Sequence, residues 1–157
     1  KRYNADKILT KTMINNYAKN NLLPPPLKKK YSKEHILVLI FIYYLKNILT
    51  INDIQTLLEP LTSKYFTASD GLTLEEIYQT VFQLEQQQVI WLEKDVLRKF
   101  EKAKQTFTEE EDEEKEFLQT FSFIAMLALD VYVKKQMIER MIDELNEKKP
   151  AHATKKK

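Results

Sequence analysis

The chain has 157 residues, of which 43% are hydrophobic and 31% are charged, a balance typical of a folded globular protein with a buried core. It contains no Cys, two His and four Ser, which excludes disulfides and Cys zinc sites and nearly excludes multi-His metal sites and Ser-His-Asp catalysis. We therefore expect no metal, no cofactor and no enzymatic activity, and a reducing, cytoplasmic location.

The net charge of +2 conceals an uneven distribution along the chain. Residues 1–50 carry +8, residues 51–120 carry −9 and residues 121–157 carry +3. The basic first part indicates a polyanionic partner, nucleic acid before a membrane surface, although a solvated lysine-rich face would give the same count. We expect a basic module over residues 1–60, a helical body over residues 73–147 and a disordered basic tail over residues 148–157.

The fold class is predicted to be all-α, with at most a minimal β wing, because Gly71 is the single glycine and tight hairpins need residues at positive φ. The first helix should begin after Thr10, whose hydroxyl can cap it. It should end at Asn20 or Asn21, because Asn tolerates the left-handed conformation. The prolines at 24–26 then predict an extended strap, followed by a basic turn.

Two further helices are predicted in the basic module. Ser32 can cap a helix that runs from Lys33 to about Asn47. Thr50 and Asp53 resemble a capping pair for a short helix, which we expect Pro60 to end.

Two long helices are predicted in the helical body. Thr73 with Glu76 forms a capping box for a helix from Leu74 to about Phe107, and Thr108 with Glu111 forms one for a helix that ends near Leu145. Acidic residues from 109 to 114 fall in the first turns of the second helix, where the helix dipole favours negative charge. We expect the two helices to pack as a hairpin.

The two longest apolar runs, Ile36 to Leu45 and Phe121 to Val133, are shorter than the roughly 18 to 20 residues needed to cross a bilayer. They predict buried helices and no membrane partner. Because one hairpin cannot easily bury all of the second run, we expect a homodimer.

Three kinds of side chain could carry a function, and each also has a structural interpretation. His35 is predicted to be a surface or packing residue rather than a switch. Asp130, the single charge within the second apolar run, is predicted to be exposed, whereas burial would indicate a dimer contact or a ligand site. The aromatic residues of the body are predicted to lie in the core or at a subunit interface: Trp91, Phe117, Phe121, Phe123 and Tyr132.

Four motifs follow one another over residues 9–58: Asn15 to Pro25, Tyr31-Ser32, Leu39 with Ile42, and Thr50 to Ile54. Their order and spacing resemble the MerR-type winged helix-turn-helix family. In that family a recognition helix ends in a Tyr and a Leu-Leu-Pro strap, a small wing ends in Tyr-Ser, and two helices follow. By this resemblance the first helix of the helix-turn-helix would lie before Leu9.

A second resemblance covers the same region. The runs from Lys11 to Tyr17 and from Pro24 to Ser32 are more similar still to an uncharacterised bacterial family known as a domain of unknown function. That family names no activity.

The resemblance to MerR-type proteins implies a recognition helix over residues 11–20 and a wing at residues 28–30. Amide side chains suit adenine edges, and lysines suit phosphates, whereas Met13, Ile14 and Tyr17 can face inward. With 22 Lys and three Arg, we expect A/T-leaning or weakly specific binding. The candidate DNA-binding residues are Lys11, Thr12, Asn15, Asn16, Lys19, Asn20, Lys28, Lys29 and Lys30.

The sequence thus predicts a transcriptional regulator that binds double-stranded DNA as a dimer. Two alternatives remain open. The winged-helix module could bind an acidic protein, or the helical body could sense an apolar small molecule.

Overall fold

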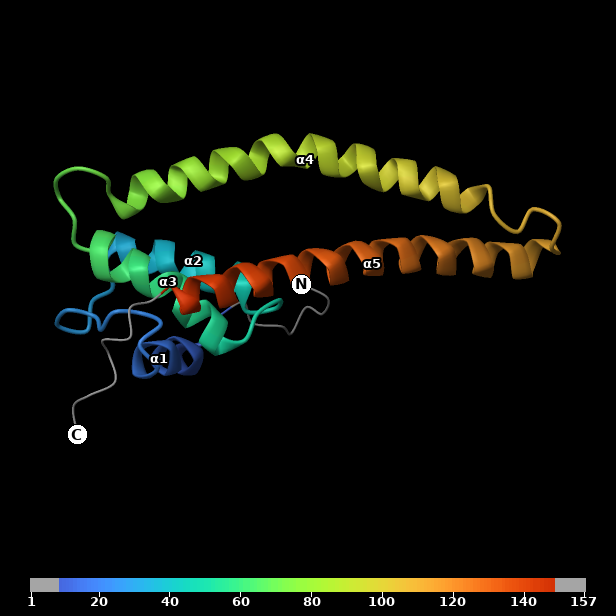
Figure 1. The fold of residues 1–157 in the computed structure, drawn as a ribbon. Helices are drawn as coiled ribbons and strands as arrows, with labels where there is room; N and C mark the ends of the chain where they lie inside the picture. The colour runs from blue at the N-terminus through green and yellow to red at the C-terminus, as the bar shows by residue number, and fades with distance from the viewer. Residues whose placement is uncertain (1–8, 149–157) are drawn as a thin grey trace. The chain divides into compact units, whose positions relative to one another are not determined.

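The computed structural model describes residues 9–148, which contain five helices and no strand (Figure 1). The all-α prediction is therefore confirmed. The predicted first helix of a helix-turn-helix and the predicted tail from residue 149 onward lie outside the described residues. The helices are α1 (Lys11–Lys19), α2 (Lys33–Leu45), α3 (Ile51–Tyr65), α4 (Leu74–Lys104) and α5 (Asp112–Glu147).

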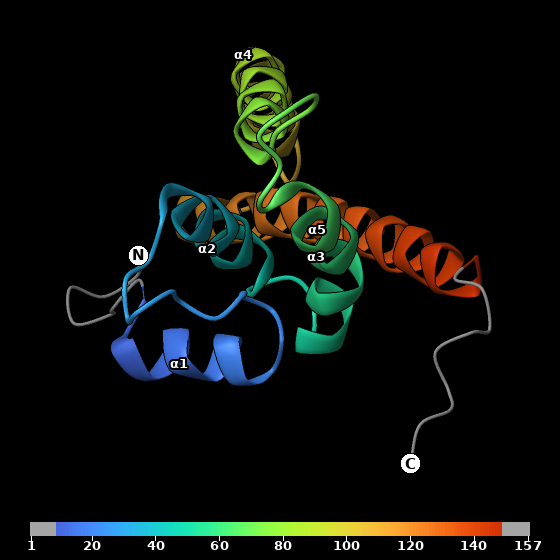
Figure 2. The same cartoon turned by 90° about the vertical axis from the view of Figure 1, so that its left-hand side faces the viewer.

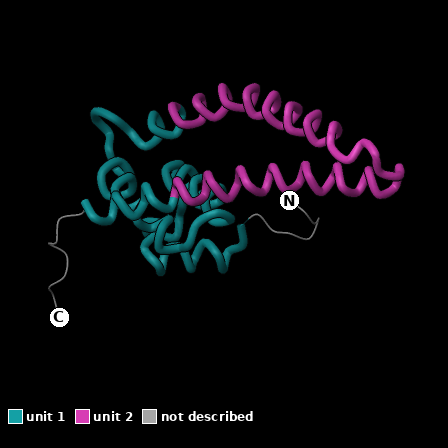
Figure 3. Tube along the Cα trace, turned by 45° about the vertical axis from the view of Figure 1, so that its right-hand side comes forward, with its two compact units in different colours: residues 1–79, 139–157 teal, residues 80–138 magenta. Residues whose placement is uncertain are grey.

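The chain divides into two compact units (Figure 3). Unit 1 consists of residues 1–79 and 139–157, and unit 2 consists of residues 80–138. The long helices α4 and α5 each begin or end in unit 1 and run through unit 2.

Helix α1 begins and ends where the sequence predicts. The Thr10 hydroxyl caps the helix by accepting a hydrogen bond from the backbone N–H of Met13, at 3.1 Å. Asn21 adopts the left-handed conformation, with a φ of 56°. The N–H of Leu22 then donates to the carbonyl of Tyr17 at 2.9 Å, a Schellman-type helix end, and both side chains are buried.

The core of unit 1 forms where α2 and α3 pack against each other and against the strap that follows α1 (Figure 2). The C-terminal end of α5 joins this unit, because Ile142 is buried and the Thr56 hydroxyl donates to Asn146 at 3.1 Å. Among the described residues of unit 1, the largest fully buried side chains are Leu22, Leu23, Val38, Ile42, Ile54 and Leu74.

The prediction that Pro60 ends the third helix is wrong, because Pro60 lies inside α3. Proline removes one backbone N–H and disfavours the helix interior by about 3 kcal/mol. The apolar positions Ile54, Leu58, Leu61 and Tyr65 nevertheless continue at helical spacing past the proline, and all four are buried or half-buried. Packing of this face therefore outweighs the local cost.

The turn between α4 and α5 corrects a second prediction. The Thr73–Glu76 capping box is present, with the Thr73 N–H donating to the Glu76 carboxylate at 2.9 Å. Helix α5, however, begins at Asp112, so Thr108 and Glu111 precede it instead of forming a capping box within its first turn. The chain needs the intervening residues to reverse direction, and Phe107 takes a left-handed φ of 53° there.

The two apolar runs behave differently. Leu37, Val38, Leu39 and Ile42 of the first run are buried in α2, as predicted. The run over residues 121–133 of α5 is not, and the prediction of a buried helix is wrong for it within this chain.

Unit 2 has almost no core of its own. The structure describes all of unit 2, and Ala103 is its one buried hydrophobic residue. Trp91, Phe117, Phe121 and Tyr132 are 60–67% exposed, so the prediction that they lie in the core of this chain is wrong, and the alternative of a subunit interface stays a prediction. By length and composition, α5 as a whole is also able to cross a membrane. The uninterrupted apolar run over residues 121–133 is too short to predict this.

Candidate nucleic-acid interface

Helix α1 presents one polar face to solvent. Met13 and Ile14 are half-buried and Tyr17 is buried, so the helix rests on its apolar side. Burial raises the pKa of the Tyr17 phenol above its usual value. The candidate residues all lie exposed on or directly after this helix: Lys11, Thr12, Asn15, Asn16, Lys19 and Asn20.

The predicted wing is reduced to a two-residue turn. Lys28 and Lys29 have φ values of 48° and 62°, and the N–H of Lys30 donates to the carbonyl of Leu27 at 2.9 Å. Leu27 and Lys30 form an isolated antiparallel bridge. Positive φ at both central residues defines a type I′ turn, a geometry that usually takes Asn and Gly. All three lysines are exposed at this turn.

The segment from Leu9 to Lys33 is uniformly basic, since it contains six Lys and no Asp or Glu. Lys33 pairs with Glu75, with 2.5 Å between the ammonium nitrogen and the carboxylate oxygen. The other five lysines form no ion pair with any residue that the structure describes. Their charges are therefore available to an external anion.

His35 fixes the point where the turn enters α2. Its Nδ1 accepts a hydrogen bond from the N–H of Ser32 at 2.9 Å, which forms part of the capping box at the start of α2. The ring is 3% exposed and lies edge-on to Tyr31 and Phe66, at centroid distances of 5.3 and 4.8 Å. The prediction of a packing role for His35 is confirmed.

Asp130 is half-buried and paired, which corrects its prediction as an exposed residue. The buried ammonium of Lys99 contacts both Asp130 of α5 and Asp95 of α4. Hydrogen bonds from Lys99 and Arg98 lower the pKa of Asp95 to about 2, and those to Asp130 and Asp95 raise the pKa of Lys99. The cluster clamps α4 to α5 within one chain.

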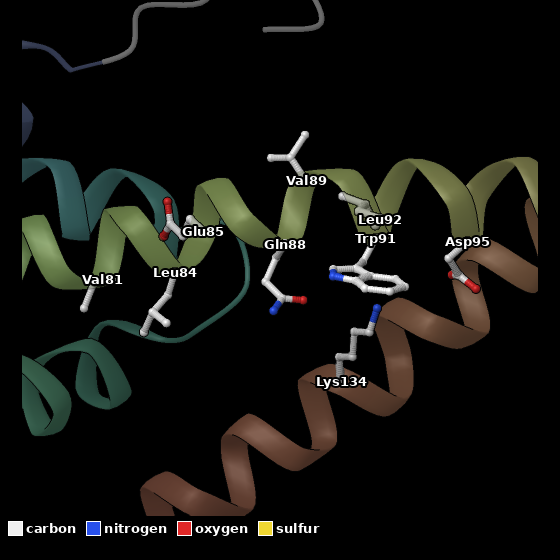
Figure 4. Close-up of a pocket in the computed structure, with 9 residues that line it drawn as sticks. All are labelled: Val81, Leu84, Glu85, Gln88, Val89, Trp91, Leu92, Asp95 and Lys134. Carbon is white, nitrogen blue, oxygen red and sulfur yellow. The ribbon is translucent and has the colours of Figure 1, made fainter.

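An open groove of about 550 Å³ lies along α4 in unit 2 (Figure 4). Its lining is mainly apolar, and the exposed Trp91 ring and the Lys134 side chain both project into it. Within residues 9–148, no group of three or more His, Asp or Glu side chains is arranged to hold a metal ion.

These features define an all-α protein in which a basic helical module precedes a long two-helix hairpin. The family described as Domain of unknown function (DUF1836) matches residues 1–81, just over half of the chain, and the chain belongs to that family. No curated protein and no solved structure matches the chain. The predicted similarity to a domain of unknown function is thus confirmed, and the MerR-type resemblance stays a prediction.

Proposed function

We propose that the basic module binds duplex DNA and that the protein regulates transcription. The observation that carries this proposal is a set of five exposed lysines that form no ion pair with a described residue: Lys11 and Lys19 lie in the short helix α1, whose amide side chains are exposed, and Lys28, Lys29 and Lys30 lie at the turn after it. The segment contains no carboxylate to oppose a polyanion. The MerR-type order of motifs over residues 9–58 supports the same interpretation.

The proposed roles divide between base reading and phosphate contact. Helix α1 has nine residues and so spans about 14 Å, which suits the roughly 12 Å width of the major groove. Asn15 and Asn16 would face base edges, where an Asn amide can form two hydrogen bonds with adenine. Lys28, Lys29 and Lys30 would contact flanking phosphates, which positions the module without reading sequence.

Fluorescence anisotropy of a labelled duplex over a salt series tests the proposal. Each neutralised phosphate contributes about −0.9 to the slope of log affinity against log salt, so five lysines per copy predict about −4 to −5, doubled for two copies. Replacing Lys28, Lys29 and Lys30 with Ala should reduce the slope by about 3 per copy. A control variant removes the same charge from unit 2: Lys94→Ala, Lys102→Ala and Lys104→Ala.

Two results would contradict DNA binding by this surface. One is an absence of binding at low salt, which would favour an acidic protein partner for the module. The other is an equal loss of affinity in the control variant, which would indicate unspecific attraction. Asn15→Ala and Asn16→Ala should change the preferred base sequence while leaving the salt slope unchanged.

A further inference from the structure

Helix α5 carries a regular apolar stripe on its surface. Its members recur at alternating spacings of four and three residues: Phe117, Phe121, Ile124, Ala128 and Val131. All five are exposed, and the four larger side chains are 58–67% exposed. This spacing is the seam of a coiled coil, which is stable when a second helix covers it.

Helix α4 does not cover this stripe, because it packs against a different side of α5. The contacts between the two helices include the Lys99–Asp130 pair and the edge-on rings of Phe100 and Phe123, at 5.5 Å between centroids. Gln119 adds a third contact by donating to the carbonyls of Lys104 and Thr106, each at 2.9 Å. These polar and aromatic contacts lie on the side of α5 that faces α4, and the stripe lies on another side.

We infer that a second copy of this chain covers the stripe, with α5 packed antiparallel against α5. This inference concerns unit 2 and does not rest on DNA binding by the basic module. The sizes and charges of the side chains along α5 support both a second copy as the partner and its antiparallel orientation.

Side-chain sizes complement each other in one antiparallel register. With the two-fold axis between residues 122 and 123, Phe121 lies opposite Ile124 of the second copy. Phe117 lies opposite Ala128 of the second copy, so that a large side chain meets a small one in each of two symmetric layers. The centre of the stripe, from Phe117 to Ala128, is therefore complementary to itself, and at each end Val131 lies opposite Glu114 of the second copy.

The charges favour the same register. It places Glu113 beside Lys134 of the second copy, twice by symmetry, at the positions that flank a coiled-coil seam. Both side chains are exposed, and Lys134, which also lines the groove along α4, directly precedes the seam position of Lys135. A parallel pair would instead place Glu114 against Glu114 and Lys135 against Lys135 within the seam. The acidic start of α5 thus selects the antiparallel arrangement.

A lipid surface is the competing occupant, because α5 is long and apolar enough to cross a membrane. Insertion of α5 would separate Asp130 from Lys99 and place a carboxylate among lipid chains, which is unfavourable. Association with a second copy keeps that ion pair intact. The structure therefore favours protein over lipid.

Sedimentation equilibrium of the whole chain at physiological salt tests the inference. The wild type should have twice the monomer mass of 18.7 kDa. Glu113→Lys and Lys134→Glu should each weaken dimerisation by at least about tenfold, because each turns two attractive pairs into repulsive ones. The double variant should recover affinity close to the wild type. Glu116→Lys makes the same charge change away from the seam and should have no effect.

Three results would overturn the inference. A wild type that stays monomeric at tens of micromolar would show that no second copy covers the stripe. The antiparallel register would be refuted if neither charge reversal weakened dimerisation. It would also be refuted if the double variant did not recover the dimerisation affinity of the wild type. Co-sedimentation of the monomer with phosphatidylcholine vesicles would assign α5 to a lipid surface. Circular dichroism confirms that each variant keeps its helices.

Discussion

The type I′ turn should be stabilised by the residues that such a turn normally uses. Lys28 and Lys29 hold φ values of 48° and 62°, and a left-handed backbone costs a residue with a side chain about 1–2 kcal/mol. Asn and Gly adopt it more easily, but Gly also gives up about 0.5–1 kcal/mol through the entropy of the unfolded chain. The double variant Lys28→Asn, Lys29→Gly should therefore gain about 1 kcal/mol.

Urea unfolding and thermal unfolding, both followed by circular dichroism, measure this gain. A change of about 1 kcal/mol corresponds to a rise of about 2–4 °C in Tm for a chain of this size. DNA affinity should move in the opposite direction, because two proposed phosphate contacts are lost. Lys30→Asn is the matched control, since it removes a charge outside the two left-handed positions and should leave stability unchanged.

The double variant should gain stability, and the control Lys30→Asn should not. An unchanged or less stable double variant would refute the argument that the backbone at Lys28 and Lys29 is strained. Equal gains in the double variant and in Lys30→Asn would attribute the effect to charge instead.

Three further predictions concern stability, each measured by thermal or urea unfolding. Gln119→Ala should lose about 1–3 kcal/mol, because the buried amide satisfies two carbonyls at the end of α4, whereas the exposed Gln105→Ala should be neutral. The pKa of Asp95 is lowered from 3.8 to about 2, so the ionised carboxylate contributes fully to the free energy of unfolding above pH 4, and this contribution disappears as the pH falls toward 2. Asp95→Asn should remove the corresponding part of the decrease in stability between pH 4 and pH 2. Asn21→Gly should keep or raise stability, while Asn21→Ala should lose about 1 kcal/mol at the left-handed helix end; equal effects would contradict that cap.

The features that the sequence predicted well depend on neighbouring residues. The hydroxyls of Thr10 and Thr73 lie three residues before the N–H groups that they accept from, and Asn21 directly follows the end of α1. The exposed face of α1 also follows from helical spacing alone. Such contacts need no knowledge of the tertiary structure.

The features that sequence reasoning missed depend on distant residues or on backbone geometry. Pro60 remains helical because the apolar face of α3 continues past it into the core. The partner of Asp130 is Lys99, 31 residues away, and no local pattern indicates that pair. The turn at Lys28 and Lys29 has a left-handed backbone but contains no Gly or Asn, the residues from which such a turn is predicted.

Mapping of backbone amide NMR shifts during titration with duplex DNA tests the central proposal most directly. The proposal predicts that the largest shifts fall at residues 11–20 and 27–31, and that residues 80–138 are unaffected. Shifts confined to the hairpin, or no shifts at low salt, would contradict DNA binding by the basic module.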